Sequence, residues 1–225
     1  YFHSVARLQA DDEIAEEVDA PMFGTILHAA VQKLYARIVG EERPAGTLRA
    51  MIRSGEVAAA VERAINENYL QDERASAEDY TGNLLLVKDI VTRYLRGGVM
   101  PYDAAHDAFA VSGLEERVAY SFPFRAGERE LEMKFGGIAD RIDALDDGTL
   151  RVVDYKTGTK KLDLKEVYCG LDCQMLLYLF SLTRDKSGRF TGAEPAGVLY
   201  LLADPAPETL SLIHISEPTR RRGIS

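Results

Sequence analysis

Two aspartates and a lysine within residues 140–156 have the types and spacing of a metal-dependent hydrolytic site. Asp140 lies at the end of one β-like run and Asp154 lies in the next, with the turn-forming residues 146–148 between them. Because such a turn places neighbouring strands side by side, the two carboxylates should meet at one sheet edge. The strand period of two puts Asp154 and Lys156 on one face, so that a carboxylate and a cation project into one pocket.

This combination suits hydrolysis of a phosphodiester bond. Carboxylate oxygens are good ligands for Mg²⁺ and Mn²⁺, and a bound divalent ion lowers the pKa of a water and offsets phosphate charge. The lysine would steady the attacking hydroxide or the charged transition state. A lone D-x-K pattern is common, however, and an aspartate beside a turn often only caps or solvates it.

Four segments, in their order along the chain, add a family resemblance. They are F-G-T-I-L-H at 23–28, G-G-I-A-D-R-I-D at 136–143, V-D-Y-K-T-G at 153–158 and Q-M-L-L-Y at 174–178. Together they resemble the PD-(D/E)XK nuclease motif, with aspartate in the D/E position. Their order is similar to that of RecB-type and AddB-type exonuclease domains, and the resemblance covers most of residues 1–204.

The resemblance implies a role for each matching residue. His28 and both aspartates would bind Mg²⁺ or Mn²⁺, and the backbone carbonyl of Tyr155 would be a further ligand. Both aspartates and Lys156 would be catalytic. The Q-x-x-x-Y element, Gln174 and Tyr178, would line the DNA site.

Several of these residues also have a structural alternative. His28 could be an ordinary helix residue, because the apolar residues around it fit a packed amphipathic face. Gly24, one turn earlier, would let another backbone come close. Gln174 and Tyr178 are one helical turn apart and share a face, but Tyr178 could equally pack in a core among residues 176–180.

Three further charged residues beside these motifs have open roles. Arg141 should face away from Asp140, in either a buried ion pair or a phosphate contact. Glu115 and Glu116 precede a predicted strand. One of them could be an outer-shell acid, although capping or solvating the start of that strand is the favoured interpretation.

Charge gives a mixed indication about nucleic acid. The 225-residue chain has a formal net charge of -9 and 46% hydrophobic residues. An acidic net charge counts mildly against a self-sufficient DNA-binding module, although other domains of a helicase-nuclease could supply the DNA-binding surface. Lys160, Lys161 and Lys165 follow the catalytic strand and either form a solvated face or contact the DNA backbone.

The ends of the chain bear on domain organisation. Residues 210–225 include L-S-L-I-H-I-S-E-P-T-R, which resembles a translated transposase sequencing adapter, so we expect this tail to be non-native. Because the chain starts at Tyr1, we expect a fragment cut at both ends. We predict one nuclease domain over 1–209, with a helical part to about 112 and an α/β core over about 113–204.

The cysteines and the hydropathy exclude several classes. Cys169 and Cys173 are one helical turn apart with no second pair, so neither a disulfide framework nor a four-cysteine metal site can be built. AddB-like nucleases often carry an iron-sulfur cluster, whose flanking cysteines this chain does not supply. The longest apolar run, 175–180, is too short to cross a bilayer, and we expect reduced thiols in a cytoplasm.

Periodicity predicts a helical first part. A helix is expected over 22–39, a second helical stretch over 48–70 with a possible break at 54–55, and a third over 83–95 that ends at Gly97-Gly98.

The period then changes to two, as is typical of strands. The expected order is α-β-β-β-α-β in an α/β sandwich with a mixed sheet, a PD-(D/E)XK restriction-endonuclease-like core that follows the helical part. The predicted elements are strands at 117–124, 130–140 and 150–156, a helix at 171–184 and a buried strand at 197–202.

The combined expectation is hydrolysis of DNA by a metal-dependent nuclease. The family likeness favours an exonuclease of double-strand-break repair that works with a helicase subunit or domain, and it implies no membrane partner. The first alternative is a catalytically silent module that binds DNA or scaffolds a repair complex. The second is a self-contained restriction-type endonuclease. The intact Asp140, Asp154 and Lys156 count against the silent module.

Overall fold

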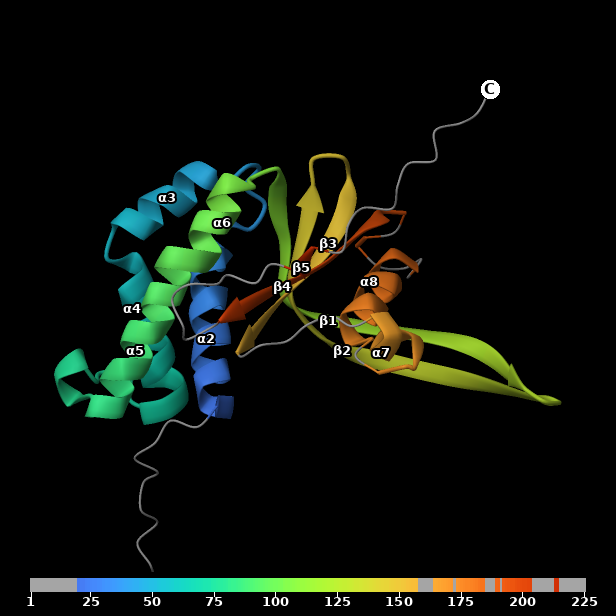
Figure 1. Cartoon of the computed structure of the whole chain (residues 1–225), viewed down its shortest axis with the longest axis horizontal. Coiled ribbons are helices and arrows are strands. Elements are labelled where there is room, and N and C mark those ends of the chain that lie inside the picture. The colour runs from blue at the N-terminus through green and yellow to red at the C-terminus, as the bar shows by residue number, and fades with distance from the viewer. Residues whose placement is uncertain are drawn as a thin grey trace, which may run out of the picture.

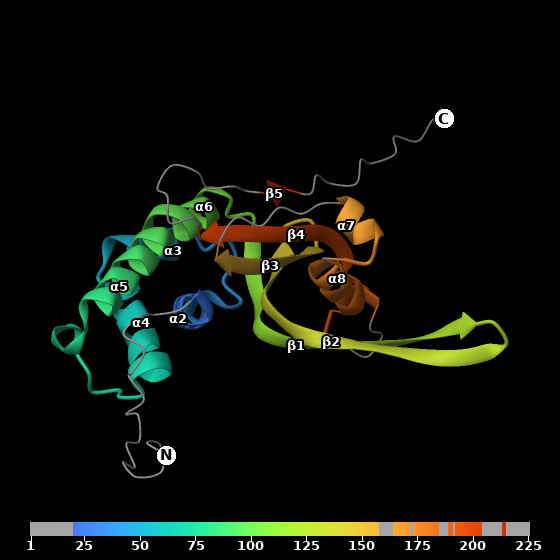
Figure 2. The same cartoon turned by 60° about the horizontal axis from the view of Figure 1, so that its bottom comes forward.

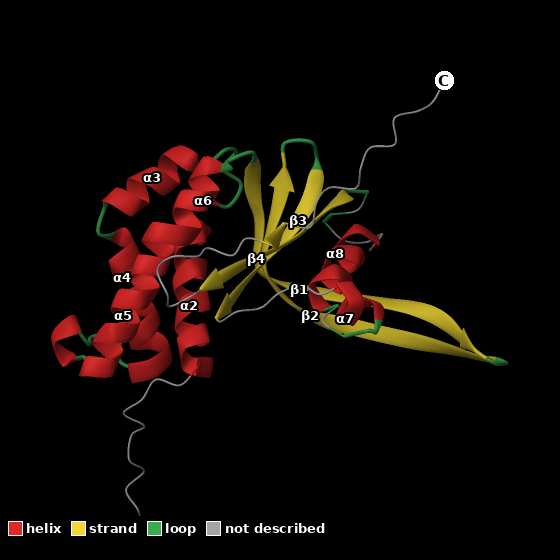
Figure 3. Ribbon diagram, viewed as in Figure 1, coloured by secondary structure: helices red, strands yellow, loops and turns green. Residues whose placement is uncertain are grey.

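The computed structural model describes residues 20–157, 164–171, 173–184, 189–190, 192–203 and 213–214. These residues form three layers, with helices α2 to α6 on one side of a mixed sheet and α7 and α8 on the other (Figures 1 and 3). This is the α/β architecture predicted from the sequence. No helix in the described ranges is both long enough and apolar enough to cross a membrane.

The helical layer follows the predicted pattern in its first half. The predicted helix at 22–39 is confirmed, and so is the break at 54–55, because α3 ends at Arg53 and α4 begins at Glu56. The layer consists of α2 (Ala20–Tyr35), η1 (Ala36–Ile38), α3 (Ala45–Arg53), α4 (Glu56–Ile65), η2 (Asn66–Leu70), η3 (Ala77–Asp79), α5 (Gly82–Tyr94), η4 (Leu95–Val99) and α6 (Met100–Ala105).

The predicted helix end at Gly97-Gly98 is wrong. From α5 the chain continues through the π turn η4 directly into α6. Leu95, Val99 and Met100 are fully buried, so the packing of this continuation outweighs the poor helix propensity of two glycines.

The sheet has the strand order β1-β2-β3-β4-β5. Only β3 and β4 are parallel to each other, while the other neighbours are antiparallel, which makes the sheet mixed as predicted. Strand β5 lies inside residues 210–225. Its two paired residues do not test where this segment comes from, so a non-native origin stays a prediction. The strands are β1 (Phe109–Ala126), β2 (Arg129–Leu145), β3 (Thr149–Thr157), β4 (Glu194–Ala203) and β5 (Ile213–His214).

Strands β1 and β2 are longer than predicted and form a hairpin that projects beyond the sheet (Figure 2). Directly opposed apolar pairs such as Tyr120 with Phe135 and Phe122 with Met133 run along one face of this hairpin. At its other end β2 continues past the predicted end at Asp140, because Arg141 and Asp143 are buried and paired instead of forming a polar turn.

The far layer consists of α7 (Leu164–Tyr168), which was not predicted, and α8 (Gln174–Arg184), which begins three residues later than expected. Four α8 residues, Met175, Tyr178, Leu179 and Leu182, pack on the sheet face that carries Ile142, Val152 and Val198. The opposite face of β3, with Val153 and Tyr155, packs on the helical layer. The strand period of two thus divides β3 between two cores.

A buried cluster of charges joins the helical layer to the sheet. Arg141 has 0% exposure, and its Nη1 and Nη2 donate to the two Asp103 carboxylate oxygens of α6 at 2.7 and 3.1 Å. The same guanidinium donates to the Tyr155 hydroxyl at 2.8 Å and to Asp143 Oδ2 at 3.0 Å. Tyr35 of α2 donates to Asp103 as well. Arg141 is therefore a buried ion-pair residue and not a phosphate contact.

Removal of one partner from this cluster should destabilise the fold strongly. In Asp103→Ala the Arg141 charge stays buried without its bidentate acceptor, so we expect unfolding free energy to fall by about 3–5 kcal/mol in urea denaturation. The matched control is Asp89→Ala, which removes an exposed i,i+4 ion pair to Arg93 on α5 and should cost less than about 1 kcal/mol. Similar losses in both variants would contradict the anchoring role of the cluster.

Candidate metal centre and active site

The candidate site lies where β2 and β3 separate. The backbone pairs of the two strands end at Arg141↔Val153, and the next residues outward are Asp140 and Asp154. Beyond this point the Tyr155 N–H donates to the Asp140 carboxylate at 3.0 Å instead of to a β2 carbonyl. We call this separation of the two strands the fork. It leaves the side chains of Asp140 and Asp154 available for other contacts.

His28 enters the fork from α2. Its Nδ1 lies 3.3 Å from Asp140 Oδ2, and its Nε2 lies 2.9 Å from the Tyr155 carbonyl oxygen. The hydrogen bond to Asp140 raises the pKa of the imidazole above its usual value, against the opposing effect of burial. A protonated ring can donate to both oxygens. The structure thus brings together an imidazole, a carboxylate and a carbonyl that the family resemblance assigns to the metal.

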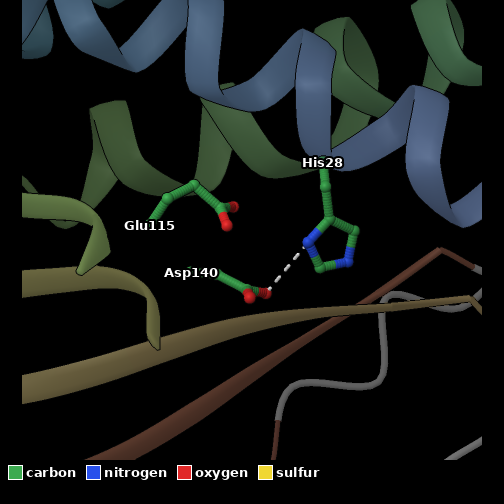
Figure 4. Close-up of side chains that lie close together, drawn as sticks. All are labelled: His28, Glu115 and Asp140. Carbon is green, nitrogen blue, oxygen red and sulfur yellow. Dashed lines mark ion pairs between the residues drawn. The ribbon is translucent and has the colours of Figure 1, made fainter. Parts of the chain in front are cut away.

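Glu115 completes a group of ligand-type atoms. One ligand atom each from His28, Glu115 and Asp140 lies within 4.8 Å of the others, and Figure 4 shows the three side chains converging from α2, β1 and β2. In the β1–β2 register, Leu114 opposes Arg141 and Glu116 opposes Ala139, which places Glu115 opposite Asp140. Burial and the Asp140 charge raise the pKa of Glu115.

The backbone at Glu115 is strained. Its φ is +47°, in the left-handed region that costs a non-glycine residue about 1–3 kcal/mol. Such outliers cluster at functional sites, where the surrounding structure holds them in place. The neighbouring Glu116 instead lines a separate cavity with Arg189 and Ser181. Between the two glutamates, the geometry therefore favours Glu115 as the acid of the site.

Asp154 and Lys156 lie next to this group and on one face of β3, as the strand period predicts. Lys156 Nζ is 3.0 Å from Asp154 Oδ1 and 2.9 Å from Oδ2, but only the contact with Oδ1 has hydrogen-bond geometry. Burial raises the pKa of Asp154, the Asp140 carboxylate raises it further, and Lys156 opposes both. The result is a buried carboxylate oxygen, Asp154 Oδ2, that has no hydrogen bond although the Lys156 ammonium lies 2.9 Å away.

The donor set fits a hard divalent cation. Three carboxylates, one imidazole and one backbone carbonyl lie at the fork. Burial raises the pKa values of Glu115 and Asp154, and the nearby Asp140 charge raises both further. Mg²⁺ and Mn²⁺ prefer oxygen ligands and accept an imidazole when carboxylates supply the rest. His28, Glu115, Asp140 and the Tyr155 carbonyl would hold such an ion, and the ligand role of the neighbouring Asp154 stays a prediction.

The Q-x-x-x-Y element lies on α8, where Gln174 Nε2 donates to the Tyr178 hydroxyl at 2.6 Å. Tyr178 is only 4% exposed and packs against Phe135 and Gly137, while Gln174 is exposed. A Cβ atom at Gly137 would lie 2.1 Å from the Tyr178 hydroxyl, so this glycine is needed for the packing. The structure thus gives Tyr178 a core contact and leaves Gln174 accessible.

The basic residues after β3 are only partly described. Lys160 and Lys161 lie outside the described residues, so their predicted contact with DNA stays a prediction. Lys165 lies on α7 with an exposed side chain.

Comparisons with known proteins agree with this geometry. The sequence profile of the PD-(D/E)XK nuclease superfamily matches residues 1–221. The chain is also 30% identical, over 203 residues, to ATP-dependent helicase/deoxyribonuclease subunits of Bacillus cereus strain G9842, Bacillus thuringiensis strain Al Hakam and Bacillus mycoides strain KBAB4. Each alignment covers 82% of this chain and 16% of the relative. The chain belongs to the PD-(D/E)XK nuclease superfamily.

Proposed function

We propose that this chain hydrolyses DNA phosphodiester bonds with Mg²⁺ or Mn²⁺ as its cofactor. The observation that carries the proposal is the convergence of His28, Glu115 and Asp140 at the fork, directly beside the Asp154–Lys156 pair. The relatives are named as helicase/deoxyribonuclease subunits, which supports DNA as the substrate. Exonucleolytic degradation in double-strand-break repair is proposed from the resemblance to RecB-type and AddB-type exonuclease domains. Their names also support a helicase subunit or domain as partner.

Each residue has a distinct task in this mechanism. His28, Asp140, Asp154 and the Tyr155 carbonyl would hold the cofactor together with Glu115. A bound divalent ion lowers the pKa of water and offsets charge on the scissile phosphate. Lys156, held against Asp154, places its ammonium where it can steady the attacking hydroxide and the charged transition state.

Substitution of Asp154 should separate catalysis from folding. We expect Asp154→Asn to lose nuclease activity but to unfold at the same or a higher temperature than wild type without metal at pH 7. The reason is that the raised pKa means an ionised Asp154 disfavours the folded state above its ordinary value of 3.8. The stability difference should shrink as the pH falls toward that value.

Degradation assays on linear DNA and metal-free thermal melts at several pH values measure both effects. Glu128→Gln in the exposed turn between β1 and β2 is the control and should change neither. Full activity of Asp154→Asn, or a large loss of its metal-free stability at pH 7, would show that Asp154 has a structural role.

Substitution of Lys156 tests the chemical step. Lys156→Ala should reduce the single-turnover cleavage rate by at least about 100-fold with little change in DNA affinity, because the ammonium acts mainly in the transition state. Lys134→Ala, which removes an exposed lysine of the β1–β2 hairpin, is the matched control. Unchanged turnover in Lys156→Ala would show that Lys156 takes no part in the chemistry, and an inactive wild type would favour the catalytically silent alternative.

The neighbouring glutamates give a matched test of the metal centre. Glu115→Gln keeps the shape but removes a charged ligand, so the Mg²⁺ concentration for half-maximal activity should rise at least about tenfold. Glu116→Gln, on the opposite side of the strand, should leave it unchanged. Titration of activity with Mg²⁺ measures this concentration in both variants. Equal values for Glu115→Gln and Glu116→Gln would show that Glu115 is not a metal ligand.

A further inference from the structure

A groove opens directly beside the candidate metal centre. Its volume is about 560 Å³, and its lining includes Glu115 and His28 of that centre. The rest of the lining comes from the exposed side of α2 and from η2. These residues are Gly24, Thr25, Ala29, Gln32 and Asn68.

Apart from Glu115 and His28 at the metal centre, the groove is lined by uncharged residues. No lysine or arginine is among the described residues that line it, and a phosphate inside it would face the Glu115 carboxylate. The side-chain amides of Gln32 and Asn68 can donate and accept hydrogen bonds, as the edge of a nucleobase requires. The volume lies in the range of about 300–1,000 Å³ that is usual for small-molecule sites.

Gly24 keeps this groove wide. An added Cβ atom would meet no atom of the described residues within 4 Å, and the φ of Gly24 is not in the left-handed region. The expectation that Gly24 admits another backbone is therefore wrong for the described part of the chain. Glycine inside a helix is less favourable than alanine, and no described contact requires it here. Its missing side chain adds open space to the groove instead.

We propose that this groove binds the base and sugar of the nucleotide whose phosphate lies at the metal centre, and that Gly24 admits them. The proposal rests on the proposed nuclease function, which places a phosphate at His28, Glu115 and Asp140. The uncharged wall of the groove, away from Glu115 and His28, suits the base and sugar, while the cation-binding centre suits the anionic phosphate.

The test fills the groove beside the metal centre and leaves every proposed ligand residue in place. Gly24→Leu places a bulky side chain in it, and Gly46→Leu makes the same change at an exposed helical glycine of α3 that likewise has no neighbour within 4 Å. In the full chain with Mg²⁺, Gly24→Leu should raise KM for single-stranded DNA at least tenfold. It should weaken binding of thymidine 5′-monophosphate, measured by calorimetry, to a similar extent. Gly46→Leu should match wild type in both.

Thermal melts complete the test. Gly24→Leu should melt no lower than wild type, because the groove is open and a helix favours leucine over glycine. A lower melting temperature would show that the chain itself fills the groove, and unchanged KM and nucleotide affinity would show that the groove takes no substrate. Both results overturn the proposal.

Thymidine 5′-monophosphate also separates the two proposals. If wild type does not cleave DNA but binds the nucleotide, and Gly24→Leu loses that binding, the nuclease function fails and the groove stands. A second variant, Gln32→Ala, removes one amide and enlarges the groove. It should weaken nucleotide binding severalfold, and undiminished binding would count against base recognition by this wall.

Discussion

The buried charge of Arg141 is the constraint on which the rest of the structure depends. A buried guanidinium must be paired with opposite charge and hydrogen-bonded, and here its Nη atoms reach α6 through Asp103 and β3 through the Tyr155 hydroxyl. Arg141 follows Asp140 directly in β2, and Tyr155 lies between Asp154 and Lys156 in β3. The residues that anchor the helical layer to the sheet are therefore sequence neighbours of the residues that form the site.

This anchoring explains how a helix residue reaches the sheet. Tyr35, one of the cluster's partners, and His28 are both on α2, seven residues or two turns apart, so the contact that orients α2 also directs His28 into the fork. His28 then contacts the Asp140 carboxylate and the Tyr155 carbonyl. Any shift of α2 along the sheet would change these two distances together, which makes the packing of the helical layer part of the geometry of the site.

Local sequence predicts only what local interactions determine. The 3.6-residue period predicted α2, and the alternation in 150–156 predicted both β3 and the shared face of Asp154 and Lys156. The sequence suggested Glu115 or Glu116 as an outer-shell acid but could not choose between them. The place of Glu115 opposite Asp140 depends on the register of β1 against β2 and on a left-handed backbone that its own sequence does not favour. The helix past Gly97 could not be predicted for the same reason, since distant packing stabilises it.

Electrostatics reconciles an acidic chain with the proposed polyanionic substrate. The net charge of -9 gives long-range repulsion of DNA, whereas catalysis depends on charge within a few ångströms of the phosphate. At the fork, the carboxylates lie so close together that burial and mutual repulsion raise the pKa values of Glu115 and Asp154. A divalent cation bound there would relieve that repulsion and reverse the local sign of the field. The acidic residues that repel DNA in the metal-free chain are then the same ones that would hold the charge to attract its phosphate.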